Sequence, residues 1–108
     1  MRRPVLLTDG AARDLDELYF AAHERHGAAT ANQILVHIRS GLDRIAATTD
    51  AGEPPPELRA LGMRDAREVR SDGHRIVYRV RDGDAHVVLI ATAVRSMQSL
   101  LQRRMLDA

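Results

Sequence analysis

The sequence of 108 residues has no cysteine, no lysine and very few aromatic side chains. Without cysteine there is no disulfide scaffold, no thiolate zinc site and no cysteine nucleophile. All 16 basic residues are arginine, which excludes a lysine nucleophile or Schiff base and is most simply explained by a GC-rich genome. Tyr19, Phe20 and Tyr78 are too few for a protein that stacks nucleic-acid bases on aromatic platforms.

Long apolar runs are also absent, so no segment approaches the roughly 20 residues that span a bilayer. Arg2 and Arg3 precede an apolar stretch that is too short for a signal peptide. We therefore expect a cytoplasmic protein with no membrane partner. The length predicts a single domain over residues 1–108, because two domains would each be too small to bury a core. A net charge of +1 excludes a polyanionic tail and a histone-like basic body.

The N-terminal half predicts a strand followed by a helical hairpin. Residues 4–8 form a short apolar run, after which Thr8 or Asp9 can cap a helix that ends at Gly27. Apolar side chains recur at helical spacing in this segment: Ala11, Leu15, Leu18, Tyr19 and Ala22. A second stripe continues to about Ala47: Ala31, Ile34, Leu35, Ile38, Leu42 and Ile45. The short connection at Gly27 implies that the two helices are antiparallel neighbours.

The C-terminal half predicts an antiparallel β-meander. Residues 48–56 contain three consecutive prolines, which exclude a helix interior and a central strand. Residues 66–71, 74–81 and 84–93 then alternate with period two and are joined by Asp-Gly pairs, which suit two-residue type I′ turns. Residues 94–106 return to a helical period. The expected fold class is α+β, with an N-terminal strand, a helical hairpin packed on a three-stranded meander, and a short C-terminal helix.

The two turns fix the register and sort the side chains onto two faces. Two-residue loops pair Arg70 with Arg75 and Arg79 with His86; they also pair Val69 with Ile76 and Tyr78 with Val87. The face beneath the hairpin is expected to carry Val69, Ile76, Tyr78, Val80, Val87 and Leu89. The opposite face is expected to carry Glu68, Arg70, Arg75, Arg79 and His86, with Val77, Val88 and Ile90 among them. Three arginines should therefore cluster on an uncovered surface.

The charges are divided along the chain. Residues 9–57 hold nine acids against four arginines, whereas residues 59–81 hold seven arginines against three acids. A basic half of this kind suits an anionic partner, or it is a solvated surface whose charges balance within the fold. Arg95 follows the last strand and either joins Arg70 and Arg75 in an anion pocket or pairs with a carboxylate.

The sequence contains no recognisable catalytic or metal-binding constellation. His23 and His26 lie three residues apart on one helical face, but their spacing suggests no third ligand. His86 suits a partly exposed strand histidine better than a general base. No phosphate loop, nucleophile elbow or dinucleotide fingerprint is present. We expect no metal, no cofactor and no small-molecule substrate.

Two stretches nevertheless resemble a known family. LTDGAARDL at residues 7–15 and EVRSDGHRIVYRV at residues 68–80 are similar to the patterns LTxxAxxDL and ELRxxGYRIxYRV of the RelE/ParE superfamily of bacterial type II toxins. The resemblance extends over nearly the whole chain, because the expected order of elements is also that of the superfamily.

RelE-like members are ribonucleases that cut messenger RNA on the ribosome with groups on an exposed sheet face. Arg75 and Arg95 fall on two arginine positions of that site, but its second-strand bases are replaced by Ala66 and Glu68, and no tyrosine or histidine follows His86. Cleavage of RNA needs a proton acceptor and a proton donor, and arginine stays protonated. The resemblance therefore keeps an anion-binding set and lacks an acid–base pair.

ParE-like members share the fold without those groups and block replication by binding DNA gyrase. We predict a ParE-like toxin with no catalytic residues, neutralised by a cognate antitoxin in a hetero-oligomer. The expected contacts with the partner are Arg70, Arg75, Arg79 and Arg95. The alternatives are a ribosome-dependent messenger RNA endoribonuclease of the RelE type and a non-toxic partner-binding module.

Overall fold

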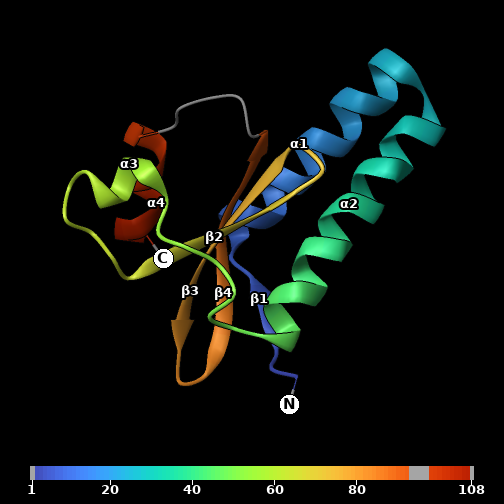
Figure 1. Ribbon diagram of the computed structural model, residues 1–108. Helices are drawn as coiled ribbons and strands as arrows, with labels where there is room; N and C mark the ends of the chain where they lie inside the picture. The colour runs from blue at the N-terminus through green and yellow to red at the C-terminus, as the bar shows by residue number, and fades with distance from the viewer. Residues whose placement is uncertain (1, 93–97, 108) are drawn as a thin grey trace.

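A four-stranded mixed sheet organises the protein (Figure 1). The computed structural model describes residues 2–92 and 98–107. In chain order the elements are β1 (Val5–Leu7), α1 (Asp9–His26), α2 (Ala28–Ala47), α3 (Pro56–Arg59), β2 (Ala66–Ser71), β3 (His74–Arg81), β4 (Asp84–Thr92) and α4 (Gln98–Asp107). The strand order is β1-β4-β3-β2; β1 runs parallel to β4, and the other pairs are antiparallel. The predicted α+β class is confirmed.

The helical hairpin begins and turns where the sequence predicts. The Thr8 hydroxyl accepts a hydrogen bond from the Ala11 N–H at 3.3 Å and so caps α1. Gly27, with φ of 91°, ends α1 and precedes α2. Both helices bury apolar side chains against one face of the sheet, where the first core cluster consists of Ala11, Ile38, Ile45, Val69, Ile76, Tyr78, Ala85, Val87 and Ile90.

The two Asp-Gly turns also form as predicted. Asp72 and Gly73 have φ of 49° and 86°, and Asp82 and Gly83 have φ of 54° and 83°, as two-residue turns of the type I′ class require. The four residue pairs expected from these turns are all confirmed by the register of β2 with β3 and of β3 with β4.

A β-bulge changes the alternation in β4. Val77 pairs with Leu89 and Tyr78 pairs with Val87, so Val88 is an extra residue in this strand. Beyond the bulge the faces are exchanged: Leu89 packs in the second core cluster, and Ile90 packs beneath the hairpin. Their predicted placements were wrong for this reason. Val80, which was also expected in the core, is 41 % exposed near the end of β3.

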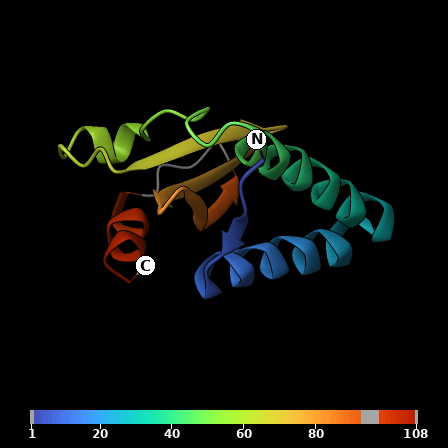
Figure 2. The ribbon, with the colours of Figure 1, turned by 90° about the horizontal axis from the view of Figure 1, so that it is seen from below.

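The second face of the sheet is covered, which corrects the expectation of a bare surface. Helices α3 and α4 pack there, and Figure 2 shows the sheet between them and the α1–α2 hairpin. Their core cluster consists of Leu58, Ala66, Val77, Val88, Leu89, Ala91, Leu101 and Met105. Proline in the first turn is compatible with the short helix α3. The predicted start of α4 near residue 94 lies outside the described residues.

A segment that we call the strap, residues 48–55, connects α2 to α3 along the edge of β2. Glu53 exchanges two backbone hydrogen bonds with Glu68, at 3.1 and 2.7 Å. The Tyr78 hydroxyl donates to the Thr49 carbonyl at 2.8 Å and accepts from the Gly52 N–H at 3.0 Å. A Cβ on Gly52 would lie 2.6 Å from the Glu68 carbonyl oxygen, so only glycine fits at this close approach.

Candidate partner-binding surface

Arg75 is buried in a cluster of ion pairs, although the sequence predicted it on an uncovered face. Its side chain is 2 % exposed. Its Nη1 and Nη2 donate to the two carboxylate oxygens of Glu57 at 2.6 and 2.7 Å. Its Nε and Nη2 donate to Glu68 at 2.9 and 3.1 Å. From the second residue of β3, the guanidinium therefore joins α3 to β2.

Hydrogen bonds to Glu57 are the main reason that the pKa of Arg75 is raised above its ordinary value, while burial opposes the rise and Glu68 adds to it. A buried guanidinium needs such partners, because an unpaired charge in the interior is costly. Glu68 is only 8 % exposed and is engaged by Arg75. Both side chains are thus engaged in internal ion pairs.

Of the two other predicted contact residues on this face, the structure describes Arg79 but not Arg95. The Arg79 side chain is 17 % exposed; it donates to Asp65 Oδ2 at 2.7 Å and to the Met105 carbonyl at 3.1 Å. It therefore connects β3 to the loop before β2 and to α4, rather than lying on an open face. Arg95 lies outside the described residues, so its predicted position beside Arg70 and Arg75 stays a prediction.

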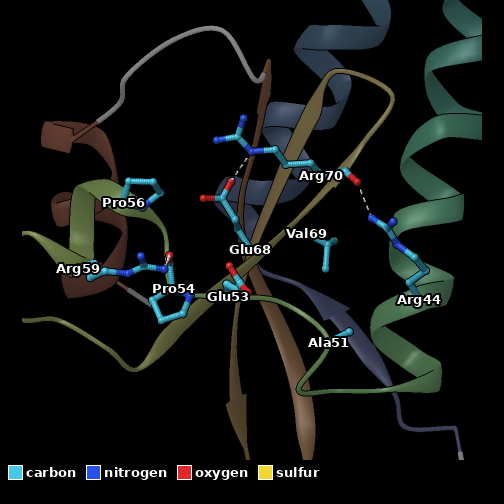
Figure 3. Close-up of a pocket in the computed structure, with 9 residues that line it drawn as sticks. All are labelled: Arg44, Ala51, Glu53, Pro54, Pro56, Arg59, Glu68, Val69 and Arg70. Carbon is cyan, nitrogen blue, oxygen red and sulfur yellow. Dashed lines mark hydrogen bonds and ion pairs between the residues drawn. The ribbon is translucent and has the colours of Figure 1, made fainter.

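Arg70 is the predicted site residue that lines an open groove (Figure 3). The groove has a volume of about 490 Å³ and lies between the strap, α2 and the outer edge of β2. Its lining residues are Arg44, Ala51, Glu53, Pro54, Pro56, Arg59, Glu68, Val69 and Arg70. The Arg70 side chain is 55 % exposed and has its Nε 3.5 Å from Glu68 Oε1.

Two further arginines, Arg44 and Arg59, complete the basic lining of this groove. Arg44 comes from the last turn of α2 and donates to the Arg70 carbonyl. Arg59 comes from α3 and donates to the Pro54 carbonyl at 3.2 Å. The sequence did not predict these two residues as part of the site, because the register fixed by the two Asp-Gly turns places only residues of the β-meander relative to one another. Their positions in the sequence could have indicated them, because Arg44 lies in the last turn of the second helix and Arg59 follows the three prolines, at the two ends of the segment that borders the groove.

The groove carries an excess of positive charge. Arg44, Arg59 and Arg70 are all exposed, whereas Glu68 shares the Arg75 guanidinium with Glu57, so these three buried or half-buried groups together keep one negative charge. Glu53 is the remaining acid of the lining. Since guanidinium groups form strong, often bidentate hydrogen bonds with carboxylates, this arrangement suits an acidic segment of a partner.

The described residues contain no group of three histidine or carboxylate side chains suited to a metal ion. Within the same two ranges, 2–92 and 98–107, no helix combines the length and apolarity of a membrane span.

Comparison with solved structures places the fold among toxin–antitoxin proteins. The chromosomal ParDE system from P. aeruginosa aligns with a TM-score of 0.68 and 17 % identity, covering 84 % of this chain and 96 % of that one. The toxin–antitoxin complex RelBE2 from Mycobacterium tuberculosis aligns with a TM-score of 0.61 and 17 % identity, covering 85 % and 92 %. A mutant of the E. coli toxin RelE in the free state gives 0.60 and 20 %, covering 95 % and 98 %.

Comparison with curated proteins found no match. The family model of the ParE toxin of the type II toxin–antitoxin system parDE, however, matches residues 5–98. This range holds the strand, the hairpin, the strap and the meander described above. The chain therefore belongs to the ParE toxin family, within the RelE/ParE superfamily that its sequence resembles.

Proposed function

We propose that this toxin acts in the cytoplasm by binding DNA gyrase and blocking replication, without catalysing a reaction itself. A cognate antitoxin neutralises it in a hetero-oligomer. The ParDE and RelBE2 neighbours, which are toxin–antitoxin systems by description, support a partner of this kind.

The observation that carries the non-enzymatic proposal is the burial of Arg75 and Glu68. A RelE-type cleavage would use the second sheet face, but α3 and α4 cover it and the Arg75 guanidinium is bound by two carboxylates. Glu68, which stands at one of the second-strand base positions of that site, is 8 % exposed. Since general acid–base catalysis requires groups within reach of the substrate, this arrangement favours binding over RNA cleavage.

The groove lined by Arg44, Arg59 and Arg70 is our candidate contact for the antitoxin. In this register the peptide groups of Glu68 and Arg70 point away from β3, toward the strap and α2. An extended acidic segment laid along the groove would place carboxylates against exposed guanidinium groups. Charge complementarity of this kind speeds association and selects partners.

The test of the proposed function pairs two assays on the purified chain. Gyrase with relaxed plasmid should lose supercoiling activity or accumulate cleaved DNA when the toxin is added, and the antitoxin should reverse the effect. A translation extract programmed with messenger RNA should show no new cuts. Ribosome-dependent cuts without an effect on gyrase would establish the RelE-type alternative, and no activity in either assay would leave the partner-binding module.

A further inference from the structure

Two histidines meet where α2 contacts the β2–β3 hairpin. His37 lies in α2, and His74 is the first residue of β3. Their ring centroids are 6.1 Å apart with an interplanar angle of 44°. His74 is 9 % exposed, and the side chain of His37 is 25 % exposed. Among the side chains of residues 2–92 and 99–106, the Nδ1 atoms of these two rings are the only buried nitrogen or oxygen atoms without a hydrogen-bond partner.

The groups around the pair come from four elements. From α2, Gln33 Nε2 lies 3.2 Å from His37 Nε2. From the turn, Asp72 Oδ2 lies 3.8 Å from the same nitrogen, and the Asp72 side chain is 63 % exposed. The Ser71 hydroxyl of β2 donates to the His37 carbonyl at 2.6 Å, and Thr92 of β4 pairs with His74. Among the described residues, Asp72 is the carboxylate within ion-pair distance of either ring.

This arrangement disfavours a positive charge on His74, because the ring is mostly buried, lies beside the His37 ring and leaves its Nδ1 without a hydrogen-bond partner. Burial lowers the pKa of His74, and the neighbouring His37 lowers it further, whereas the Ser71 backbone and the backbone and carboxylate of Asp72 oppose the shift. A folded pKa below the unfolded value means that the histidine contributes full stability above about pH 6.5 and loses it as the pH falls.

We propose that His37 and His74 form a proton-sensitive junction that holds the β2–β3 hairpin on α2 at neutral pH and loosens it in mild acid. The junction adjoins the groove described above, because Ser71, which anchors to His37, follows Arg70 directly. Loosening it would also separate Arg44 from the Arg70 carbonyl, the contact between α2 and the edge of β2. The junction acts on the isolated chain and does not depend on the identity of the toxin's target.

Amide hydrogen exchange of the full chain tests the junction at about pH 7.5 and about pH 5.5, with rates corrected for intrinsic exchange. Protection of the amides of residues 69–76 should fall several-fold in acid and by about tenfold at most, because one histidine that binds its proton only in the open form shifts opening by no more than this between the two pH values. The double variant His37→Gln/His74→Gln should lose less than about twofold. His26→Gln, which removes an exposed histidine of α1, should behave like the parent chain.

An equal acid response in the double variant, or none in the parent chain, would overturn the proposal. Protection that rises with zinc chloride and falls again with a chelator would overturn it as well, since the rings would then be metal ligands. Titration of the parent chain by histidine ring NMR needs no variant to fold. His74 should titrate below the ordinary histidine value of about 6.5, and titration at or above that value would contradict the junction.

Discussion

The sequence predicted the face of the sheet on which Arg75 lies, but it predicted an exposed side chain where the structure has a buried one. The period-two pattern assigns it to the face opposite the hairpin, and it does lie on that face. The pattern is silent on whether something covers that face. Glu57, which forms the bidentate pair, is separated from Arg75 by 18 residues and comes from a helix behind a proline run. Pairing of this kind depends on tertiary structure, so the sequence could predict the arginine but not its burial.

Glu57→Gln should destabilise the protein by about 1–3 kcal/mol, because it removes the charged acceptor of two hydrogen bonds from the buried Arg75 guanidinium, which stays paired with Glu68. Urea denaturation followed by circular dichroism measures the change. The matched control is Asp43→Asn, which breaks the Arg2–Asp43 pair at 64 % and 62 % exposure and should cost less than about 1 kcal/mol. Equal effects of the two substitutions would mean that the Arg75 cluster adds no more than a surface pair.

At the scale of the elements, local signals were enough for the hairpin and the meander. Thr8 acts through its own side-chain hydroxyl, and Gly27 and the two Asp-Gly turns act through their own backbone preferences, so the sequence places them to within a residue. The bulge in β4 is different, because its support comes from another element: Asp14 of α1 accepts from the Ile90 N–H at 3.0 Å, two residues beyond Val88. The sequence of β4 alone does not contain this information.

Arg104 adds polar contacts that attach α4 to α1 and β4. Its Nη1 and Nη2 donate to Asp14 at 2.9 Å each, and Nη1 also donates to the Val88 carbonyl at 3.0 Å. Arg104→Gln should raise hydrogen exchange in residues 98–107 by at least about tenfold and leave β3 unchanged, since a local opening exposes only the element that it frees. Arg103→Gln, at an exposed neighbouring position, is the control. Uniform deprotection of the whole chain would instead indicate a loss of global stability.

The strap depends on Tyr78 in a comparable way. Tyr78→Phe leaves the Gly52 N–H and the Thr49 carbonyl without their partner and should cost about 1–3 kcal/mol at neutral pH. Burial raises the pKa of Tyr78, so the parent chain keeps this contribution below about pH 10 and loses it as the pH rises. Thermal unfolding at several alkaline pH values should therefore show a flatter decline in the variant. An unchanged slope would mean that Tyr78 does not govern alkaline stability.

On the scale of the whole molecule, the division of charge along the sequence predicted only part of the basic surface of the groove. The basic segment 59–81 does contribute Arg59 and Arg70 to the groove, but its Arg75 and Arg79 form ion pairs within the fold. Arg44 belongs to the acidic half and reaches the groove only because α2 packs beside β2. Surface charge is set by which partners the fold brings together, and a count along the sequence cannot show this.

Charge reversal in the groove should weaken the antitoxin complex without unfolding the toxin. Arg70→Glu should raise the dissociation constant about 10–100-fold and reduce its dependence on salt, because a carboxylate–guanidinium contact is replaced by repulsion. Isothermal titration calorimetry at two salt concentrations measures both effects. Arg13→Glu, on the exposed side of α1, should leave the affinity within about twofold. A similar loss in both variants would indicate long-range charge effects rather than contact in the groove.

The parallel pairing of β1 with β4 has a consequence for how the protein is made. Val5–Leu7 adds to the sheet beside Ala85–Val87, and the Thr8 hydroxyl donates to the Val87 carbonyl across 79 positions of the chain. During synthesis, β1 cannot pair in the sheet until β4 has left the ribosome, because β4 is its neighbour in the sheet. Contacts between residues so far apart in the sequence also slow folding. The sheet is therefore completed only after β4 has been synthesised, so translation products truncated before β4 should lack the toxin's architecture.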